Sequence, residues 1–304
     1  MEEIKEIRIE DKEYPESLKN IKNPPKILYY RGDFIKKDAS PIGSPVGLRP
    51  KGLRPRENCF AVVGTRNPSD YGKEVALTIS SELADAGLII VSGMAPGIDT
   101  ISHKAVVEKG MRTIAVLGTG LDEKSIYPKE NLELSRKIIE NGGCLISELP
   151  PGTSGSKFTF PKRNRIISGL SLGVLIIEAK EKSGSLITAK YAKEQNKKLF
   201  AVPGSIFSSN SKGSNNLIKE GATMLLSTND ILEELQLSPI MSKQYLSSED
   251  KEEQIIISRL KEESLDIDKI IEKTGLSPSV VATKLALMEI SGTIRNLGGN
   301  IYSL

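Results

Sequence analysis

The segment Lys157–Leu170, KFTFPKRNRIISGL, holds the side chains in this 304-residue chain that are best suited to binding chemistry. Its first nine residues contain four basic side chains, two phenylalanines and an asparagine, and no acid. Cations interleaved with aromatic rings suit a single-stranded nucleic acid, because the cations pair with phosphates while a base stacks on a ring. The expected contact residues here are Lys157, Phe160, Arg163, Asn164 and Arg165.

A purely structural role for this segment is the alternative. Phe158 or Phe160 would then belong to the core. One of Arg163 and Arg165 would instead form an ion pair with Glu148 or Glu178.

Glycine-rich turns at the ends of apolar runs add a second signal. They are Gly64-Thr65-Arg66, the stretch 92–99 around Gly93, and 118–120. Glycine lets an anion approach the backbone closely, and the N-terminus of a following helix favours a phosphate. Each turn by itself also fits an ordinary chain reversal, so we expect a phosphate-like ligand near Arg66 and Gly93 from the three together.

The stretch 178–189, EAKEKSGSLITA, supplies another polar loop that opens a helix. Ser183 and Ser185 can donate hydrogen bonds to a phosphate or cap the helix, and both roles can hold at once.

Signatures of several enzyme classes are absent from the sequence. It contains no GxxxxGK[ST] loop, no GxGxxG with an acidic partner, and no Ser/His/Asp set. The single histidine, His103, lies in a helical pattern, and there are only two cysteines with no CxxC. We therefore expect no metal site, no cofactor and no catalytic residue.

Seven short β-branched runs predict the strands that position these residues. They are almost continuously apolar, which is typical of strands covered on both faces. The expected strands are Phe60–Gly64, Leu88–Ser92, Thr113–Leu117, Cys144–Ser147, Val174–Ala179, Leu199–Pro203 and Thr223–Leu226. Helical patterns lie between them at 71–86, 98–109, 131–141, 184–196 and 214–220. This alternation predicts an α/β fold with a doubly wound, mostly parallel sheet.

The chain is expected to divide into four parts. Residues 1–57 form a lead-in and a Pro/Gly-rich basic linker, and 58–236 form the sheet domain. A second linker spans 237–248. Residues 249–304 then show three helical patterns followed by two short strands around Gly298-Gly299, which is the pattern of a winged helix.

Charge differs between these parts. Residues 249–304 carry 7 Lys/Arg and 10 Asp/Glu, whereas residues 1–248 carry 35 and 29. A polyanion should therefore meet the sheet domain rather than the tail. No apolar run is long enough to cross a bilayer and the N-terminus has no signal-like core, so we expect a soluble cytoplasmic protein with no membrane partner.

Eight blocks of sequence, in order, resemble the DNA-processing protein A family (DprA, also called Smf). They include VVGTR (62–66), SGMAPGIDTISHKA (92–105), TIAVLGTGLD (113–122), FPKRNRIISGLS (160–171), EAKEKSGSLITA (178–189) and GSNNLIKEGA (213–222). The resemblance implies an extended Rossmann-like domain that binds single-stranded DNA, forms a homodimer and loads the RecA recombinase onto the DNA. It also implies a binding protein rather than an enzyme.

The resemblance assigns roles to particular residues. It places Arg66, Lys157, Phe160 and the Arg163-Asn164-Arg165 cluster in the DNA pocket. It implies dimer contacts at Ile218 and Met224, for which core packing is the alternative.

Two other functions remain as alternatives. The first is a Rossmann-like nucleotide-binding protein or phosphoribohydrolase-like enzyme. The phosphoribohydrolases have a PGGxGTxxE signature, whereas the corresponding strand end here reads SGSLITA and lacks the glutamate, which disfavours hydrolysis. A transcription regulator would need cations on the third helix of the tail, where Lys284 is the only one. We therefore expect the winged helix to contact protein rather than duplex DNA.

Overall fold

The computed structural model describes residues 3–34, 58–237, 250–261, 263–290 and 293–303. The chain divides into two units between Pro239 and Ile240, and each unit has its own core. This division lies inside the expected linker 237–248, most of which is outside the described residues, as is the Pro/Gly-rich stretch 39–56.

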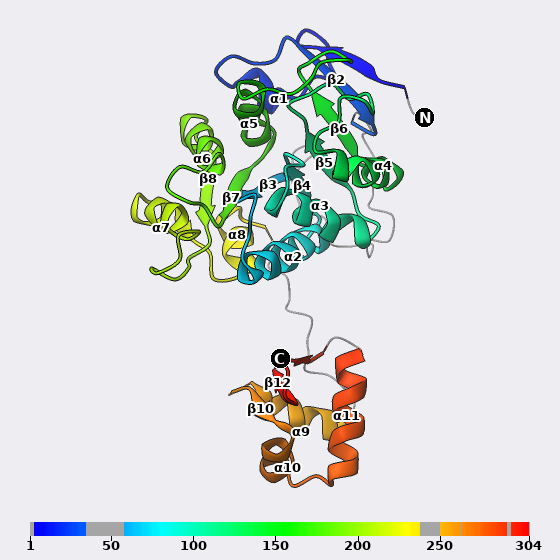
Figure 1. Cartoon of the computed structure of the whole chain (residues 1–304), viewed down its shortest axis with the longest axis vertical. Coiled ribbons are helices and arrows are strands. Elements are labelled where there is room, and N and C mark those ends of the chain that lie inside the picture. The colour runs from blue at the N-terminus through cyan, green and yellow to red at the C-terminus, as the bar shows by residue number, and fades with distance from the viewer. Residues whose placement is uncertain (1–2, 35–57, 238–249, 262, 291–292, 304) are drawn as a thin grey trace. The chain divides into compact units, whose positions relative to one another are not determined.

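A nine-stranded sheet forms the centre of the larger unit (Figure 1). Its strands are β1 (Lys5–Arg8), β2 (Ile27–Gly32), β3 (Cys59–Gly64), β4 (Ile89–Ser92), β5 (Thr113–Val116), β6 (Cys144–Ser147), β7 (Gly173–Ile177), β8 (Lys198–Ala201) and β9 (Thr223–Met224). Their spatial order is β1-β2-β6-β5-β4-β3-β7-β8-β9. The strands from β3 to β9 run parallel, which confirms the predicted doubly wound sheet.

Helices cover both faces of this sheet, which explains why the central strands are buried along their length. The helices are α1 (Glu16–Lys19), α2 (Asp70–Asp85), α3 (Ile98–Glu108), α4 (Leu132–Glu140), α5 (Thr159–Leu170), α6 (Ser185–Glu194), α7 (Lys212–Lys219) and α8 (Thr228–Glu234), with a 3₁₀ turn at Lys129–Asn131. One face packs against α1, α5, α6 and α7, and the other against α2, α3 and α4.

The N-terminal segment is part of the same sheet. β2 pairs antiparallel with β6, with Tyr30 opposite Ile146, and β1 pairs with β2. Leu18 and Tyr14 are buried in the same core as the parallel strands. The described part of residues 1–57 therefore belongs to the larger unit rather than forming a separate lead-in.

The strand order reverses direction between β3 and β7. The chain runs from β3 through β4 and β5 to β6 on one side, then returns through α5 to β7 on the other side of β3. Loops after two such strands diverge and leave a crevice at their carboxyl ends, where open α/β sheets bind ligands.

The smaller unit confirms the predicted winged-helix pattern. Its elements are α9 (Lys251–Leu260), β10 (Leu265–Asp266), α10 (Ile267–Thr274), α11 (Pro278–Ile290), β11 (Arg295–Asn296) and β12 (Ile301–Ser303). Asp250 and Asp266 cap α9 and α10 by accepting hydrogen bonds from backbone N–H groups. The three strands pair in the order β10-β12-β11. In the part of the chain that the structure describes, no helix has the length and apolar character that a membrane span requires.

Candidate nucleic-acid interface

A pocket of about 350 Å³ opens at the carboxyl ends of β3 and β7, where the strand order reverses. The first turns of α5 and α6 close it from one side. Its lining includes Thr65, Arg66, Asn67, Asp99, Phe160, Arg163, Asn164, Lys180, Lys182, Ser183 and Ser185. Six residues that the sequence predicts for DNA binding are thus brought together: Arg66, Phe160, Arg163, Asn164, Ser183 and Ser185.

Exposed cations surround this pocket. Arg66 follows β3, while Lys180 and Lys182 follow β7, and all three are exposed. Asp99 is the one carboxylate in the described lining, and it is buried. The mouth of the pocket is therefore electropositive, which suits an anionic ligand.

Phe160 supplies an aromatic wall. Its ring lies 5.6 Å from that of Tyr127, and a Cβ built at Gly118 would lie 2.8 Å from its Cδ1 atom. The ring is thus held in place by its neighbours while it remains half-buried and lines the pocket. The core alternative does not hold for Phe158, which is 72% exposed.

Arg163 is a buried cross-link that forms part of the pocket lining. Its Nη1 donates to the carbonyl of Gly93 at 2.7 Å and to the carbonyl of Val116, at the ends of β4 and β5. Its Nε donates to Asn164 Oδ1 at 3.1 Å, and Asn164 in turn donates to the carbonyl of Gly184 at 3.3 Å. Arg163 therefore joins three strand and helix ends, in addition to lining the pocket.

Gly93 contacts this guanidinium rather than lining the pocket. Its N–H donates to Asp99 Oδ2 at 3.1 Å, and a Cβ at this position would lie 2.5 Å from Arg163 Nη2. The sequence predicts that Gly93 admits a phosphate oxygen. In the structure its N–H is bonded to Asp99, and its lack of a side chain makes room for Arg163.

Burial shifts the pKa of two lining residues and of a histidine near them. It raises the pKa of Asp99 and lowers that of Arg163 to about 10, to which the nearby Arg66 charge contributes. Burial, together with the Arg163 charge, also lowers the pKa of His103 to about 3. His103 is therefore neutral at physiological pH, and it lies outside the described lining of the pocket.

Arg165 points away from this site. Its Nη2 donates to Glu148 Oε2 at 2.5 Å, and its side chain is only 6% exposed. Lys162 contacts the same carboxylate at 3.2 Å. The ion-pair alternative is thus the arrangement found for Arg165, with Glu148 as its partner.

Lys157 lies outside the described lining of the pocket, three residues before Phe160 in the sequence. It is exposed, and its Nζ lies 5.2 Å from the ring centroid of Phe158.

Glu178 is the other carboxylate that the sequence offers as an arginine partner. In the structure it instead accepts hydrogen bonds from the N–H (2.8 Å) and Oγ of Ser69 at the start of α2.

Ser183 and Ser185 support one another at the start of α6. Their hydroxyl oxygens lie 2.8 Å apart, and the Ser185 N–H donates to Ser183 Oγ at 3.3 Å. Both residues line the pocket beside the positive end of the helix.

The lining also contains residues that are not among the predicted contacts, and those with polar side chains at its mouth include Thr65, Asn67, Lys180 and Lys182. The two lysines carry a usable signal, because they flank a glutamate in a loop that follows a predicted strand. Asn67 has no such signal, since its place depends on how the loop after β3 folds.

The two candidate dimer residues differ in exposure. Ile218 on α7 is half-buried and packs against the core, whereas Met224 on β9 is 45% exposed at the edge of the sheet.

Among the described residues, no group of three or more His, Cys, Asp or Glu is placed to hold a metal ion.

Comparisons with known proteins identify relatives of both units. A model of the DNA recombination-mediator protein A family matches residues 5–236, and a model of the DprA winged helix domain matches 242–300. DNA processing protein DprA of Bacillus subtilis is 44% identical over 232 residues, covering 76% of this chain and 71% of the relative. Protein Smf of Synechocystis is 35% identical and covers 96% of this chain and 78% of the relative.

Solved structures agree with this result. The crystal structure of DNA processing protein A from Streptococcus pneumoniae is 39% identical, with a TM-score of 0.64, and covers 76% of this chain and 74% of that chain. A structure that describes the single-stranded DNA binding mode of the Helicobacter pylori protein is 31% identical, with a TM-score of 0.61, covering 78% and 98%. This chain therefore belongs to the DNA recombination-mediator protein A family.

Proposed function

We propose that this chain binds single-stranded DNA in the pocket between β3 and β7, as a homodimer, and loads the RecA recombinase onto the DNA. The observation that carries the proposal is the combination of an aromatic wall with an electropositive rim at a strand-order reversal. Phe160 offers a face for a base, while Arg66, Lys180 and Lys182 lie where phosphates would pass. The Helicobacter pylori relative, whose single-stranded DNA binding mode has been described, supports the same ligand.

The residues predicted for DNA binding have different proposed roles in this pocket. Arg66, Asn164, Ser183 and Ser185 donate to the DNA, and Phe160 stacks a base. Lys157 meets the strand at the approach to the pocket. Arg163 and Gly93 hold the floor, and Arg165 stabilises α5 through Glu148.

Dimerisation is proposed through α7 and the edge strand β9. Met224 presents an exposed apolar side chain there, and Leu226, just beyond, is 75% exposed. Two pockets on one dimer would raise the affinity for longer strands through their high local concentration. The recombinase would receive a strand held in this way, as the family's description as a recombination mediator suggests.

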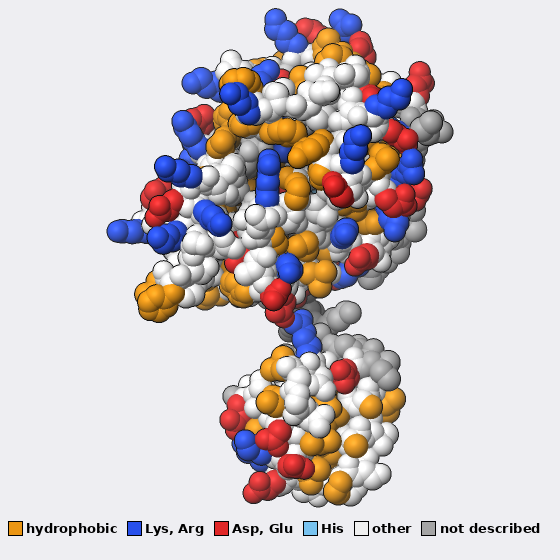
Figure 2. Space-filling view, viewed as in Figure 1, with side chains coloured by type: hydrophobic (Ala, Val, Ile, Leu, Met, Phe, Trp, Pro, Cys, Tyr) orange, Lys and Arg blue, Asp and Glu red, His pale blue; other side chains and the backbone are white. Residues whose placement is uncertain are grey.

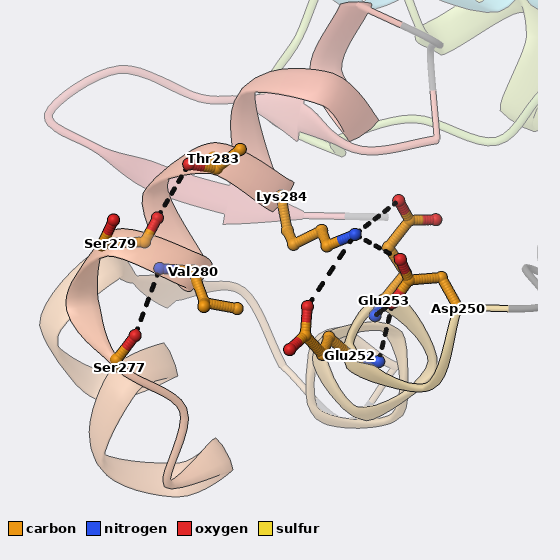
Figure 3. A network of polar contacts seen from close by, with 8 residues as sticks. All are labelled: Asp250, Glu252, Glu253, Ser277, Ser279, Val280, Thr283 and Lys284. Atoms are coloured by element: carbon orange, nitrogen blue, oxygen red, sulfur yellow. Dashed lines mark hydrogen bonds and ion pairs between the residues drawn. The ribbon is translucent and has the colours of Figure 1, made fainter.

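The winged helix is proposed to contact protein rather than duplex DNA. Lys284, the one lysine or arginine on α11, lies among three carboxylates, those of Asp250, Glu252 and Glu253 (Figure 3). The visible face of this unit shows acidic and hydrophobic side chains with few cations (Figure 2). A duplex-binding helix needs cations that are free to meet phosphates.

Fluorescence anisotropy of labelled oligo-dT tests the proposed pocket. Phe160→Ala should weaken binding at least about tenfold, because a stacked base contributes about 1–3 kcal/mol. Arg66→Ala should weaken binding and reduce the slope of log affinity against log salt by about one unit. Lys190→Ala is the matched control, since Lys190 is an exposed cation on α6 outside the described lining.

Thermal unfolding of each variant separates lost binding from lost folding. Folded Phe160→Ala and Arg66→Ala proteins that bind like the wild type would contradict the pocket assignment. If the folded wild type binds nucleoside monophosphates but not oligo-dT, the protein is a nucleotide-binding protein instead.

A further inference from the structure

The loop between β8 and α7 displays two adjacent apolar side chains. Phe207 is 93% exposed and Ile206 is 77% exposed. Leaving such side chains in water forgoes the free energy that their burial would provide. Single exposed apolar side chains are common on protein surfaces, but two adjacent ones that are almost fully exposed form a patch that calls for an explanation.

Hydrogen bonds hold this loop in a defined shape. Asn215 pins its start, because its side chain accepts from the N–H of Gly204 at 3.1 Å and donates to the carbonyl of Gly204 at 2.9 Å. The Phe207 N–H donates to Ser205 Oγ at 3.3 Å, and the Ser208 N–H donates to the carbonyl of Ser205 at 3.0 Å. The two apolar side chains therefore extend from a built turn.

The loop is attached directly to the segments that form the pocket. Asn210 Nδ2 donates to the carbonyl of Asn67, a lining residue, at 3.1 Å. At the other end, the Gly213 N–H donates to the carbonyl of Ala179, next to Lys180, at 2.7 Å. A single-stranded DNA that leaves the proposed pocket past Asn67 would therefore contact this loop next.

The charge of the loop suits a polyanion. Residues 203–213 contain no carboxylate and one cation, Lys212, whose ammonium lies 3.9 Å from the Glu181 carboxylate in the loop after β7. Four serines and one asparagine make up half of the other ten residues, and their side chains can donate to phosphates. An aromatic ring in an uncharged or basic surrounding is the arrangement that stacks bases of a single strand.

We propose that the Ile206–Phe207 tip is a second base-contacting site, which takes a base of the same single strand after it leaves the pocket. This inference rests on the proposed function and extends it from a pocket to a path. Phe207 stacks the base, Ile206 packs against its edge, and Lys212 lies near the connecting backbone.

Oligonucleotide length tests the proposal. Anisotropy is measured with oligo-dT of about 5 and about 20 nucleotides, since single-strand sites span a few to some 16 nucleotides. Phe207→Ala should weaken binding of the longer strand about tenfold and leave the shorter one unchanged, because only the longer strand reaches the loop. Phe207→Trp keeps an aromatic ring and should bind the longer oligonucleotide like the wild type. The control is Leu77→Ala, which removes a half-exposed apolar side chain from α2 and should leave the affinity unchanged.

The outcomes separate this inference from the proposed function. If Phe160→Ala weakens both strands but Phe207→Ala binds both like the wild type, the path is wrong and the pocket stands. If Phe207→Ala changes the elution volume in gel filtration and not the affinity, the tip is a protein contact, and the proposal is overturned. If the folded wild type binds neither strand, the proposed function itself fails.

Discussion

Two arginines that are two positions apart on α5 have separate roles. Residues i and i+2 lie about 200° apart around a helix, so Arg163 and Arg165 point to nearly opposite sides. Arg163 reaches the ends of β4 and β5, while Arg165 reaches Glu148 after β6. A basic cluster in sequence therefore becomes a pocket floor and a buried ion pair.

The Arg165–Glu148 pair should matter for stability and not for DNA binding. Glu148→Gln leaves the buried guanidinium with a neutral partner, and loss of one partner of a buried pair costs about 3–5 kcal/mol. We expect a lower urea midpoint and an unchanged oligo-dT affinity of the folded protein. Glu123→Gln is the control, because its exposed pair with Arg136 should contribute less than about 1 kcal/mol. Equal losses in the two variants would show that Glu148 has no special role.

His103 should make the protein less stable as the pH falls. The Thr113 hydroxyl donates to the carbonyl of Ile90 at 2.7 Å, so its oxygen accepts from His103 Nδ1–H at 2.8 Å. The folded pKa of about 3 lies below the unfolded value of about 6.5. In this pH range the imidazole of His103 is protonated in the unfolded chain and neutral in the folded one. The free energy of unfolding therefore decreases as the pH falls from about 6.5 to about 3.

A comparison with His103→Asn isolates this effect, because an asparagine amide can still donate to Thr113. Between about pH 7 and pH 5 the wild type should lose about 2 kcal/mol more unfolding free energy than the variant. Urea unfolding at both pH values measures the difference. Parallel pH dependence of the two proteins would mean that His103 does not cause it.

Single elements decide where this protein can associate. β9 is a two-residue strand at the edge of the sheet, and both of its residues are exposed. An edge strand with exposed apolar neighbours is a natural site for pairing with another copy. Ile218 on α7 packs partly against the core, so Met224 is the better residue for a test.

Met224→Asp should convert the proposed dimer to a monomer, because a buried carboxylate without a partner is costly. Light scattering coupled to gel filtration measures the mass. The affinity for a long oligo-dT should decrease with the mass, whereas that for a short one should not. Leu77→Asp, at a similarly exposed position on α2, should leave the mass unchanged. A dimer that persists in Met224→Asp would place the interface elsewhere.

At the scale of the whole molecule, the two units differ in the sign of their net charge. The last 56 residues are net acidic and the rest is net basic. In the smaller unit, Lys284 is bound by the carboxylates at the start of α9. The larger unit is therefore expected to supply the attraction for DNA.

Deletion of residues 249–304 should leave the affinity for single-stranded DNA within about twofold of the wild type. Anisotropy with oligo-dT and with a duplex of the same length measures both. A large loss for either ligand would show that the winged helix contacts DNA. The larger unit has its own core, so circular dichroism should show that the shortened chain remains folded.

Short apolar runs are enough to predict the parallel strands, and helical patterns predict most of the helices of the sheet domain and the three helices of the tail. These patterns are local, because a strand covered on both faces must be apolar along its whole length. The turn after β3 and the basic segment of α5 are also visible in sequence, and both reach the pocket. By contrast, α5 and α8 were not among the expected helices.

Only the tertiary structure decides which of these residues face a ligand. The burial and the partners of a side chain depend on segments that are far apart in the chain. Glu148 forms an ion pair with Arg165, Asp99 accepts a hydrogen bond from the Gly93 N–H, and β2 pairs with β6. The positions of Lys180 and Lys182 in the pocket lining follow from the reversal of strand order between β3 and β7. Residue types and spacing thus determine the elements and the class of ligand. Long-range packing determines which side chains remain free to bind it, because a charge or ring that finds a partner inside the protein is no longer available outside it.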